Sequence, residues 1–181
     1  MSDQTSTADR AIKSGTDRRI EVLPHTITKL QNSTGLNILL AMADNGASYL
    51  SSQLLTYPDI SSVTAFDTRY GTPTLTELQT YDAVMVWTNY TPYDATALGD
   101  VLADYVDAGG GVVIGTFAWY SNCGSYSMCG RIMNPSYTPL VSTSSGNHSI
   151  TASMQILNES QPIMKDVVSA TDRFRDYTSL T

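Results

Sequence analysis

The sequence lacks several features that would place it in a class of proteins. No apolar run approaches the roughly 18–20 residues of a membrane-spanning helix, so no membrane insertion is expected. The N-terminal residues have no apolar stretch of the kind that a secretory signal carries. Basic side chains are scarce, because 10 Lys and Arg residues stand against 17 Asp and Glu residues. Nucleic acids and anionic membrane surfaces need basic patches, so the composition argues against both as partners.

The negative charge is concentrated in the body of the chain. Residues 1–35 hold five basic and four acidic side chains, whereas residues 36–181 hold five basic and thirteen acidic ones. An acidic body favours solubility. The chain either stays inside the cell, in the cytoplasm, or is a piece of a larger extracellular or cell-surface protein. The sequence ends soon after RFRDY, which resembles the start of another strand. This is consistent with the chain being a piece of a larger protein.

Residues 1–34 are predicted to form a flexible N-terminal arm. Residues 1–19 are polar, mixed in charge and without periodicity, and the apolar piece at residues 20–30 is broken by Pro24. Residues 35–181 are predicted to form one α/β domain, truncated at its C-terminus if the chain is a piece of a larger protein.

Apolar strand patterns alternate with helical patterns along this domain. The predicted strands are residues 37–43, 60–66, 83–87 and 112–114. The predicted helices are residues 47–57, a short helix that Pro73 and Thr74 open, and a longer one that Gly109–Gly111 ends. Strands that are apolar along their length are typical of a parallel sheet covered on both faces. The predicted fold is a flavodoxin-like three-layer α/β sandwich with a mostly parallel, doubly wound sheet.

The alternation stops after Phe117. Residues 118–147 are rich in Gly, Ser, Tyr and Asn and are predicted to form a long loop, before a strand at residues 149–157. Exposed Tyr, Trp and Asn side chains suit adaptable contacts with protein partners or glycans. The contact residues predicted for this loop are Trp119, Tyr120, Tyr126 and Tyr137.

Both cysteines of the chain, Cys123 and Cys129, lie within this loop. A disulfide between them is expected in an oxidising compartment, and free thiols are the alternative. A zinc site would need further ligands, and His25 and His148 are remote in sequence. Neither cysteine lies at a strand-to-helix turn, which disfavours a catalytic thiol. The sequence therefore predicts no metal site and no cofactor.

Polar side chains follow the predicted strands at the edge where a parallel sheet places its working loops. These candidate ligand-binding residues are Asp44, Asn45, Asp67, Thr88, Asn89 and Thr116. Such a cluster could hold a hydrated cation or sugar hydroxyls. The same residue types also cap helices and form turns, and this second interpretation is favoured. Asp100, Asp104 and Asp107 are predicted to form the solvated side of the long helix.

The sequence shows no motif for phosphate binding or nucleophilic catalysis. Gly109–Gly111 precedes a strand, whereas a phosphate-binding loop follows a strand and opens a helix. Thr116 occupies the turn where a nucleophile would lie, but a threonine needs an activating base and the sequence names none. Thr116 is therefore only a weak catalytic candidate.

Four segments resemble the class I glutamine amidotransferase-like superfamily, and most closely its ThuA-like branch. They are NILLAMADN from Asn37, YDAVMVW from Tyr81, LADYVDAGGGVVIGTFAW from Leu102 and QPIMKDVVS from Gln161. The resemblance covers about residues 36–176 and implies the same α/β fold. A fold of this kind hosts many functions, so the resemblance says less about activity.

The resemblance also implies that the amidotransferase chemistry is lost. Active members carry a Cys in the turn after the fourth strand and a later His-x-Glu pair. Here that turn is Gly115-Thr116-Phe117-Ala118, and His148 is followed by Ser149 and Ile150. ThuA-like members often lack the Cys too, and are linked to sugar metabolism or occur as modules of large, often extracellular proteins.

Three functions are consistent with these observations. The leading hypothesis is a non-catalytic module that serves binding or assembly, with a protein or glycan partner. The second is a ThuA-like enzyme or binder that acts on a carbohydrate or a related small molecule through the carboxyl-end residues. The third is a structural subunit whose N-terminal arm, residues 1–34, reaches a neighbouring copy.

Overall fold

The computed structural model of the chain describes residues 35–115, 117–119, 123, 125–138, 142–153, 160, 162, 167, 169 and 171–180. Of residues 142–150, 152 and 172–180 it describes the backbone alone. The predicted N-terminal arm, residues 1–34, lies outside the described residues.

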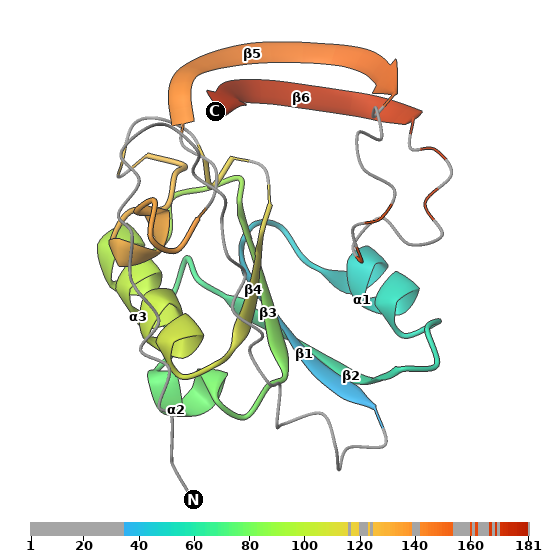
Figure 1. Cartoon of the computed structure of the whole chain (residues 1–181), viewed down its shortest axis with the longest axis vertical. Coiled ribbons are helices and arrows are strands. Elements are labelled where there is room, and N and C mark those ends of the chain that lie inside the picture. The colour runs from blue at the N-terminus through green and yellow to red at the C-terminus, as the bar shows by residue number, and fades with distance from the viewer. Residues whose placement is uncertain are drawn as a thin grey trace, which may run out of the picture.

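The centre of the molecule is a four-stranded sheet in which every pairing is parallel. Its strands are β1 (Leu36–Ala43), β2 (Ile60–Asp67), β3 (Ala83–Thr88) and β4 (Gly111–Ile114), in the order β2-β1-β3-β4. Three helices connect them: α1 (Ser48–Leu54), α2 (Leu75–Leu78) and α3 (Ala95–Asp107). Figure 1 shows α1 on one face of the sheet and α2 and α3 on the other. This arrangement confirms the predicted flavodoxin-like α/β sandwich.

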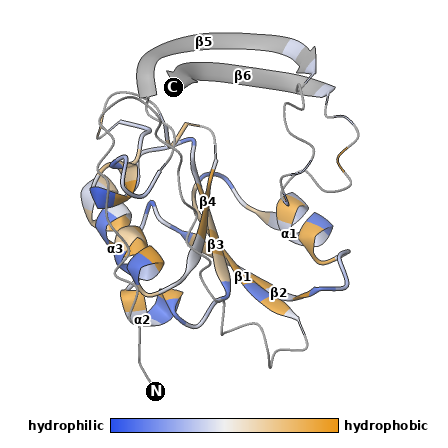
Figure 2. Cartoon of the chain, viewed as in Figure 1, coloured by the Kyte–Doolittle hydropathy of each residue, from blue (hydrophilic) through white to orange (hydrophobic). Residues whose placement is uncertain are grey.

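Strand β1 is buried on both faces, as its unbroken apolar sequence predicts. Leu39 and Ala41 pack into the larger core, beneath α2 and α3, whereas Leu40 and Met42 face α1. All four side chains are almost fully buried. Figure 2 shows that much of the central sheet has the colour of hydrophobic residues. The residues that continue β1 are therefore carried to one edge of a rigid sheet.

Helix α3 has local sequence signals at its start, at its end and along its buried side. Asp94 caps its first turn by accepting hydrogen bonds from the backbone N–H groups of Thr96 and Ala97. Gly109 ends it with a φ of 90°, a left-handed conformation that suits glycine. Its inward side chains include Leu98, Leu102 and Tyr105, all of which the 3–4 spacing predicts.

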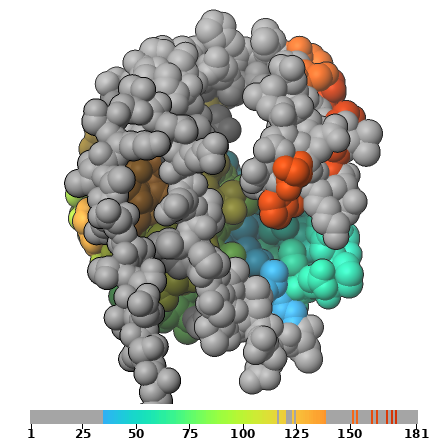
Figure 3. Space-filling model, viewed as in Figure 1, coloured from blue at the N-terminus to red at the C-terminus, as the bar shows by residue number. Residues whose placement is uncertain are grey.

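Helix α1 is shorter than predicted, Ser48–Leu54 instead of residues 47–57. No side chain caps its start, and the backbone N–H groups of Thr56 and Tyr57 bond to carbonyls three residues back, in a tighter turn. Leu50 and Leu54 pack against the sheet, but Tyr49 does not share their side of the helix and is 78% exposed. In Figure 3 the turquoise surface around α1 is visible from this side of the molecule.

A second sheet pairs β5 (Ser142–Ser153) with β6 (Thr171–Leu180) in an antiparallel ribbon. The prediction of a loop as far as residue 147 is wrong, because β5 already begins at Ser142. The first half of β5 is polar and contains Gly146, so the sequence has no apolar alternation there that would predict a strand. The strand conformation of this half depends on its pairing with β6. In Figure 1 this ribbon lies beyond the carboxyl ends of the parallel strands.

Candidate functional site

The carboxyl ends of β1, β2 and β3 bring most of the predicted polar residues together. Met42 of β1 pairs with Asp67 of β2, and Ala43 pairs with Thr88 of β3. Asp44 and Asn45 continue β1, and Asn89 continues β3, so they emerge at the same edge. We call the interacting residues of this edge the polar rim: Asp44, Asn45, Asp67, Arg69, Trp87, Asn89 and Tyr90.

Both carboxylate oxygens of Asp44 are occupied by neighbouring donors. Oδ2 accepts from the indole N–H of Trp87 at 3.0 Å, and Oδ1 accepts from Nδ2 of Asn89 at 3.2 Å and the backbone N–H of Asn45 at 2.7 Å. Partial burial raises the pKa of Asp44, but these hydrogen bonds and the charge of Arg69 outweigh it, so the pKa lies below its ordinary value. Asp44 is therefore an ionised structural anchor.

Asp67 is held in the same way, by a fork of hydrogen bonds from Arg69. Nε donates to Oδ1 at 2.9 Å and Nη2 donates to Oδ2 at 2.6 Å. These hydrogen bonds from Arg69 lower the pKa of Asp67, because they favour the charged form. The carboxylate and the guanidinium neutralise each other, and both side chains are less than a quarter exposed.

Arg69 links this ion pair to the rest of the polar rim. Its Nη1 donates to Oδ1 of Asn45 at 2.8 Å, and Nδ2 of Asn45 donates to the hydroxyl of Tyr90 at 2.6 Å. The guanidinium lies 5.1 Å from the ring centroid of Tyr90 and 5.4 Å from that of Tyr70. A single arginine therefore fixes a carboxylate, an amide and two aromatic rings.

Thr88 differs from its predicted role, because its side chain is fully buried on the α3 side of the sheet. Thr68, which directly follows β2, is also buried, and its backbone N–H donates to the carbonyl of Met42 in β1. Within the part of the chain that the structure describes, the hydroxyls of both threonines have no hydrogen-bond partner. Such buried hydroxyls each carry a cost in stability.

The turn after β4 carries the one non-glycine residue with a positive φ among the described residues. That residue is Phe117, with a φ of 67°. The weak catalytic candidate Thr116 lies outside the described residues. Phe117 has no group that can act as nucleophile, acid or base, so the strained position of this turn holds an inert side chain.

Exposed tyrosines also occur in the segments that follow the parallel strands. Five of them follow the carboxyl end of a parallel strand, and we call them the tyrosine rim: Tyr49, Tyr70, Tyr90, Tyr93 and Tyr126. Tyr70, Tyr93 and Tyr49 are 79%, 72% and 78% exposed. Tyr57 is also exposed, but it lies before β2, at the opposite edge of the sheet. The loop aromatics selected from the sequence include just one member of this group, Tyr126.

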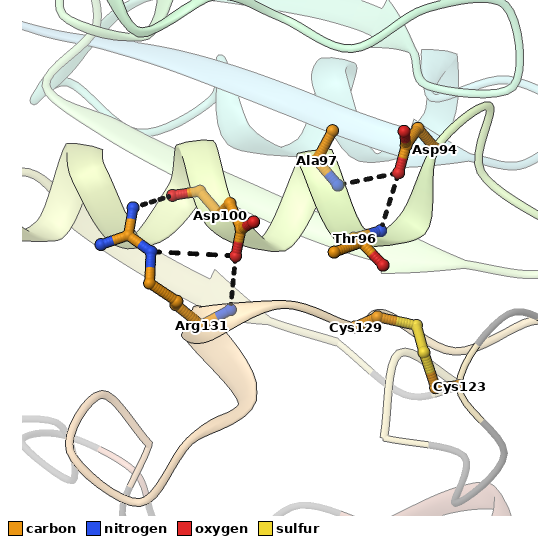
Figure 4. Close-up of a disulfide and its surroundings, with 7 residues drawn as sticks. All are labelled: Asp94, Thr96, Ala97, Asp100, Cys123, Cys129 and Arg131. Carbon is orange, nitrogen blue, oxygen red and sulfur yellow. Dashed lines mark hydrogen bonds and ion pairs between the residues drawn. A yellow bond between two sulfur atoms is a disulfide. The ribbon is translucent and has the colours of Figure 1, made fainter.

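Cys123 and Cys129 form a disulfide, as predicted. The end at Cys129 is buried against α3, where its backbone N–H donates to the carbonyl of Ala95 at 3.2 Å. Gly99 makes this approach possible, because a Cβ there would lie 1.7 Å from the carbonyl oxygen of Cys129. Figure 4 shows the disulfide and Arg131 on the segment that runs along α3.

The acidic residues of α3 contact the loop that follows β4. The prediction that they form only a solvated side of the helix is therefore wrong. Asp104 pairs with Arg131, Asp100 accepts from the backbone N–H of Arg131 at 2.8 Å, and Asp107 lies 3.7 Å from Nη1 of that arginine. The hydroxyl of Tyr137 also donates to Asp107, at 2.8 Å. These half-exposed contacts join the loop to the helix by its charged side.

The predicted contact loop is therefore partly folded back on the domain. Trp119 donates to the carbonyl of Ile114 at 3.5 Å and is partly buried, as is Tyr137. Tyr126 remains 49% exposed. Tyr120 lies outside the described residues. The role of these four residues in binding stays a prediction.

In the part of the chain that the structure describes, no three His, Cys, Asp or Glu side chains are grouped so that they could hold a metal ion. The same part contains no helix that is long and apolar enough to cross a membrane.

No family model, curated protein or solved structure matches this chain.

Proposed function

We propose that the protein is a non-catalytic, amidotransferase-like module that serves binding through the carboxyl-end edge of its sheet. The observation that carries this proposal is the state of the rim carboxylates. Asp44 and Asp67 use all four of their oxygens in contacts within the chain, and their pKa values lie below the ordinary value. A carboxylate that acts as general acid or base near neutral pH typically has a raised pKa, and neither of these carboxylates has one.

The turn after β4 supports the same proposal. The resemblance to the amidotransferase-like superfamily places a nucleophilic Cys in this turn, and the chain has Thr116 and Phe117 instead. The two cysteines of the chain are joined to each other, so neither is a free thiol.

The tyrosine rim supplies the contact surface in this proposal. Tyrosine rings offer large, rigid contact area, with a hydroxyl that can donate or accept a hydrogen bond. Arg69 holds Tyr70 and Tyr90 in place, so little side-chain entropy is lost when a partner binds. The exposed rings and hydroxyls of these tyrosines suit contact with a glycan, which we take as the first class of partner to test.

The disulfide supports a location outside the cytoplasm. Disulfides persist in oxidising compartments and are rare where cellular thiols keep cysteines reduced. A module of a larger surface or extracellular protein meets that condition.

The proposal is tested on an array of immobilised oligosaccharides. The wild-type chain is compared with Tyr70→Ala/Tyr93→Ala and with Tyr57→Ala, which removes another exposed tyrosine, at the opposite edge of the sheet. We expect the double variant to lose at least about tenfold in affinity, as for the loss of two aromatic anchors, and Tyr57→Ala to bind like the wild type.

Equal binding by the double variant and the wild type would contradict the role of the tyrosine rim. Release of ammonia from glutamine, or turnover of any oligosaccharide on the array, would contradict the non-catalytic assignment. The chain could instead bind only to other copies of itself, and the double variant could abolish that binding. This result would indicate a protein partner in place of a glycan.

A further inference from the structure

The turn after β1 contains the dipeptide Asn45–Gly46, and both residues are exposed. An asparagine followed by glycine can cyclise when the glycine nitrogen attacks the side-chain amide carbon. Gly46 has a φ of +94° and open space around the position of a Cβ. The attacking nitrogen is therefore unhindered, and the backbone can rotate toward the side chain at low cost.

The amide oxygen of Asn45 is already polarised. Nη1 of Arg69 donates to this Oδ1 at 2.8 Å, and Asp67 holds the guanidinium in place. Attack on the amide carbon moves negative charge onto Oδ1. A positively charged donor aimed at that oxygen before the reaction begins stabilises the developing charge.

A proton donor lies beside the leaving nitrogen. The hydroxyl of Tyr90 is 2.6 Å from Nδ2 of Asn45, which donates to it in the resting state. When the carbon becomes tetrahedral, Nδ2 regains its lone pair and can accept the phenolic proton. Tyr90 is 40% exposed, so it can recover a proton from water.

We propose that Asn45–Gly46 is a self-modifying site, at which Arg69 and Tyr90 assist deamidation of Asn45. The bond from the Gly46 nitrogen to Cγ of Asn45 forms, and the bond from Cγ to Nδ2 breaks. The Gly46 nitrogen loses its proton to water, Tyr90 supplies a proton to Nδ2, and ammonia leaves. One water molecule then opens the succinimide ring, to give either aspartate or isoaspartate at position 45.

The product changes the polar rim. A carboxylate replaces the amide between Arg69 and Tyr90, and it adds a negative charge near Asp44. It competes with Asp67 for the guanidinium, and isoaspartate also lengthens the backbone by one carbon. The chemistry is independent of the proposed binding function, because it needs just residues of this chain and water.

The test follows deamidation of the folded 181-residue chain at neutral pH by peptide mapping and tandem mass spectrometry. The folded rate at Asn45 is compared with that of the same chain unfolded in urea, and the other asparagines serve as internal controls. We expect the folded protein to react at least about tenfold faster, a conservative value for one positioned charged donor. Arg69→Ala and Tyr90→Phe are each expected to slow the folded rate, and Gly46→Ala to suppress it.

A folded rate equal to or below the unfolded rate would overturn the proposal. So would an unchanged or faster reaction in Tyr90→Phe, which keeps the aromatic ring over Arg69 and removes one hydroxyl. That variant keeps the test decisive if Arg69→Ala fails to fold. None of these outcomes depends on whether the array detects a ligand.

Discussion

Arg69 is the residue on which the order of the polar rim depends. It contacts Asp67, Asn45, Tyr70 and Tyr90, and those four side chains come from three different loops. The described residues 35–138 contain one other cationic side chain, Arg131, and this is paired with the acidic side of α3. Both arginines of this acidic region are therefore paired with acidic side chains of the same chain, and neither is left unpaired for an anionic partner.

The pH dependence of stability follows from the lowered pKa of Asp67. A carboxylate whose folded pKa lies below its unfolded value stabilises the fold above the unfolded pKa. That contribution is lost as the pH falls through the folded pKa. Asp67→Asn is expected to cost about 1 kcal/mol near neutral pH, the upper range for a bidentate pair of this exposure, and less in acid. Urea unfolding of both chains across the acidic range measures the difference.

Glu77 supplies the control for that experiment. Its pKa is also lowered, by hydrogen bonds from the backbone and side chain of Thr74 in the capping box of α2, far from the rim. Glu77→Gln should give a pH dependence of its own without releasing Arg69. A stability difference between wild type and Asp67→Asn that stays constant down to the most acidic pH would refute the assignment.

At the scale of the elements, the loop that carries the disulfide is packed on α3 through glycine. A Cβ on Gly99 would meet the carbonyl oxygen of Cys129, and a Cβ on Gly130 would lie 2.5 Å from the carbonyl of Thr96. The loop backbone thus lies directly on the helix. Met128 and Ile132 bury their side chains in the same contact.

Gly99→Ala tests this contact. Alanine favours a helix by about 1 kcal/mol over glycine, so an isolated helix would gain stability. Here the added methyl group meets backbone that must move, and we expect a net loss of about 1–3 kcal/mol. Thermal unfolding measures it. Gly111→Ala is the matched control, since open space surrounds that glycine, and its stability should be unchanged or slightly higher.

If Gly99→Ala were as stable as the wild type, the loop would not be fixed on α3 in the way described. The loop would then be as mobile as its composition alone suggests.

At the scale of the whole molecule, the parallel part of the fold is predictable from the sequence because each strand carries a local signal. The apolar runs, the 3–4 spacing of α3 and the glycine stop after it are all properties of short segments. The start of β5 is not, since its polar residues are ordered by pairing with β6. Similarly, Tyr49 lies outside the core because it is not on the side of α1 from which Leu50 and Leu54 pack on the sheet.

The sequence predicts where the candidate site lies, but it does not predict which side chains contact one another there. The rule that parallel strands place their loops at one edge selects Asp44, Asn45, Asp67 and Asn89. It does not select Arg69, because a single arginine in a turn has no local pattern that shows which distant side chains it contacts. The register could have found Trp87, which pairs with Met42 two residues before Asp44. The buried state of Thr88 depends on the packing of α3 and has no signal in the sequence.

The central claim is that the rim carboxylates are structural anchors and not catalytic groups. Carbon-13 NMR titration of the side-chain carboxyl signals of Asp44 and Asp67 tests it most directly. We predict that both titrate below their ordinary value of 3.8, as hydrogen bonds to the charged form require. A titration of either carboxyl near neutral pH would contradict the account and would indicate an acid–base catalyst at this edge of the sheet.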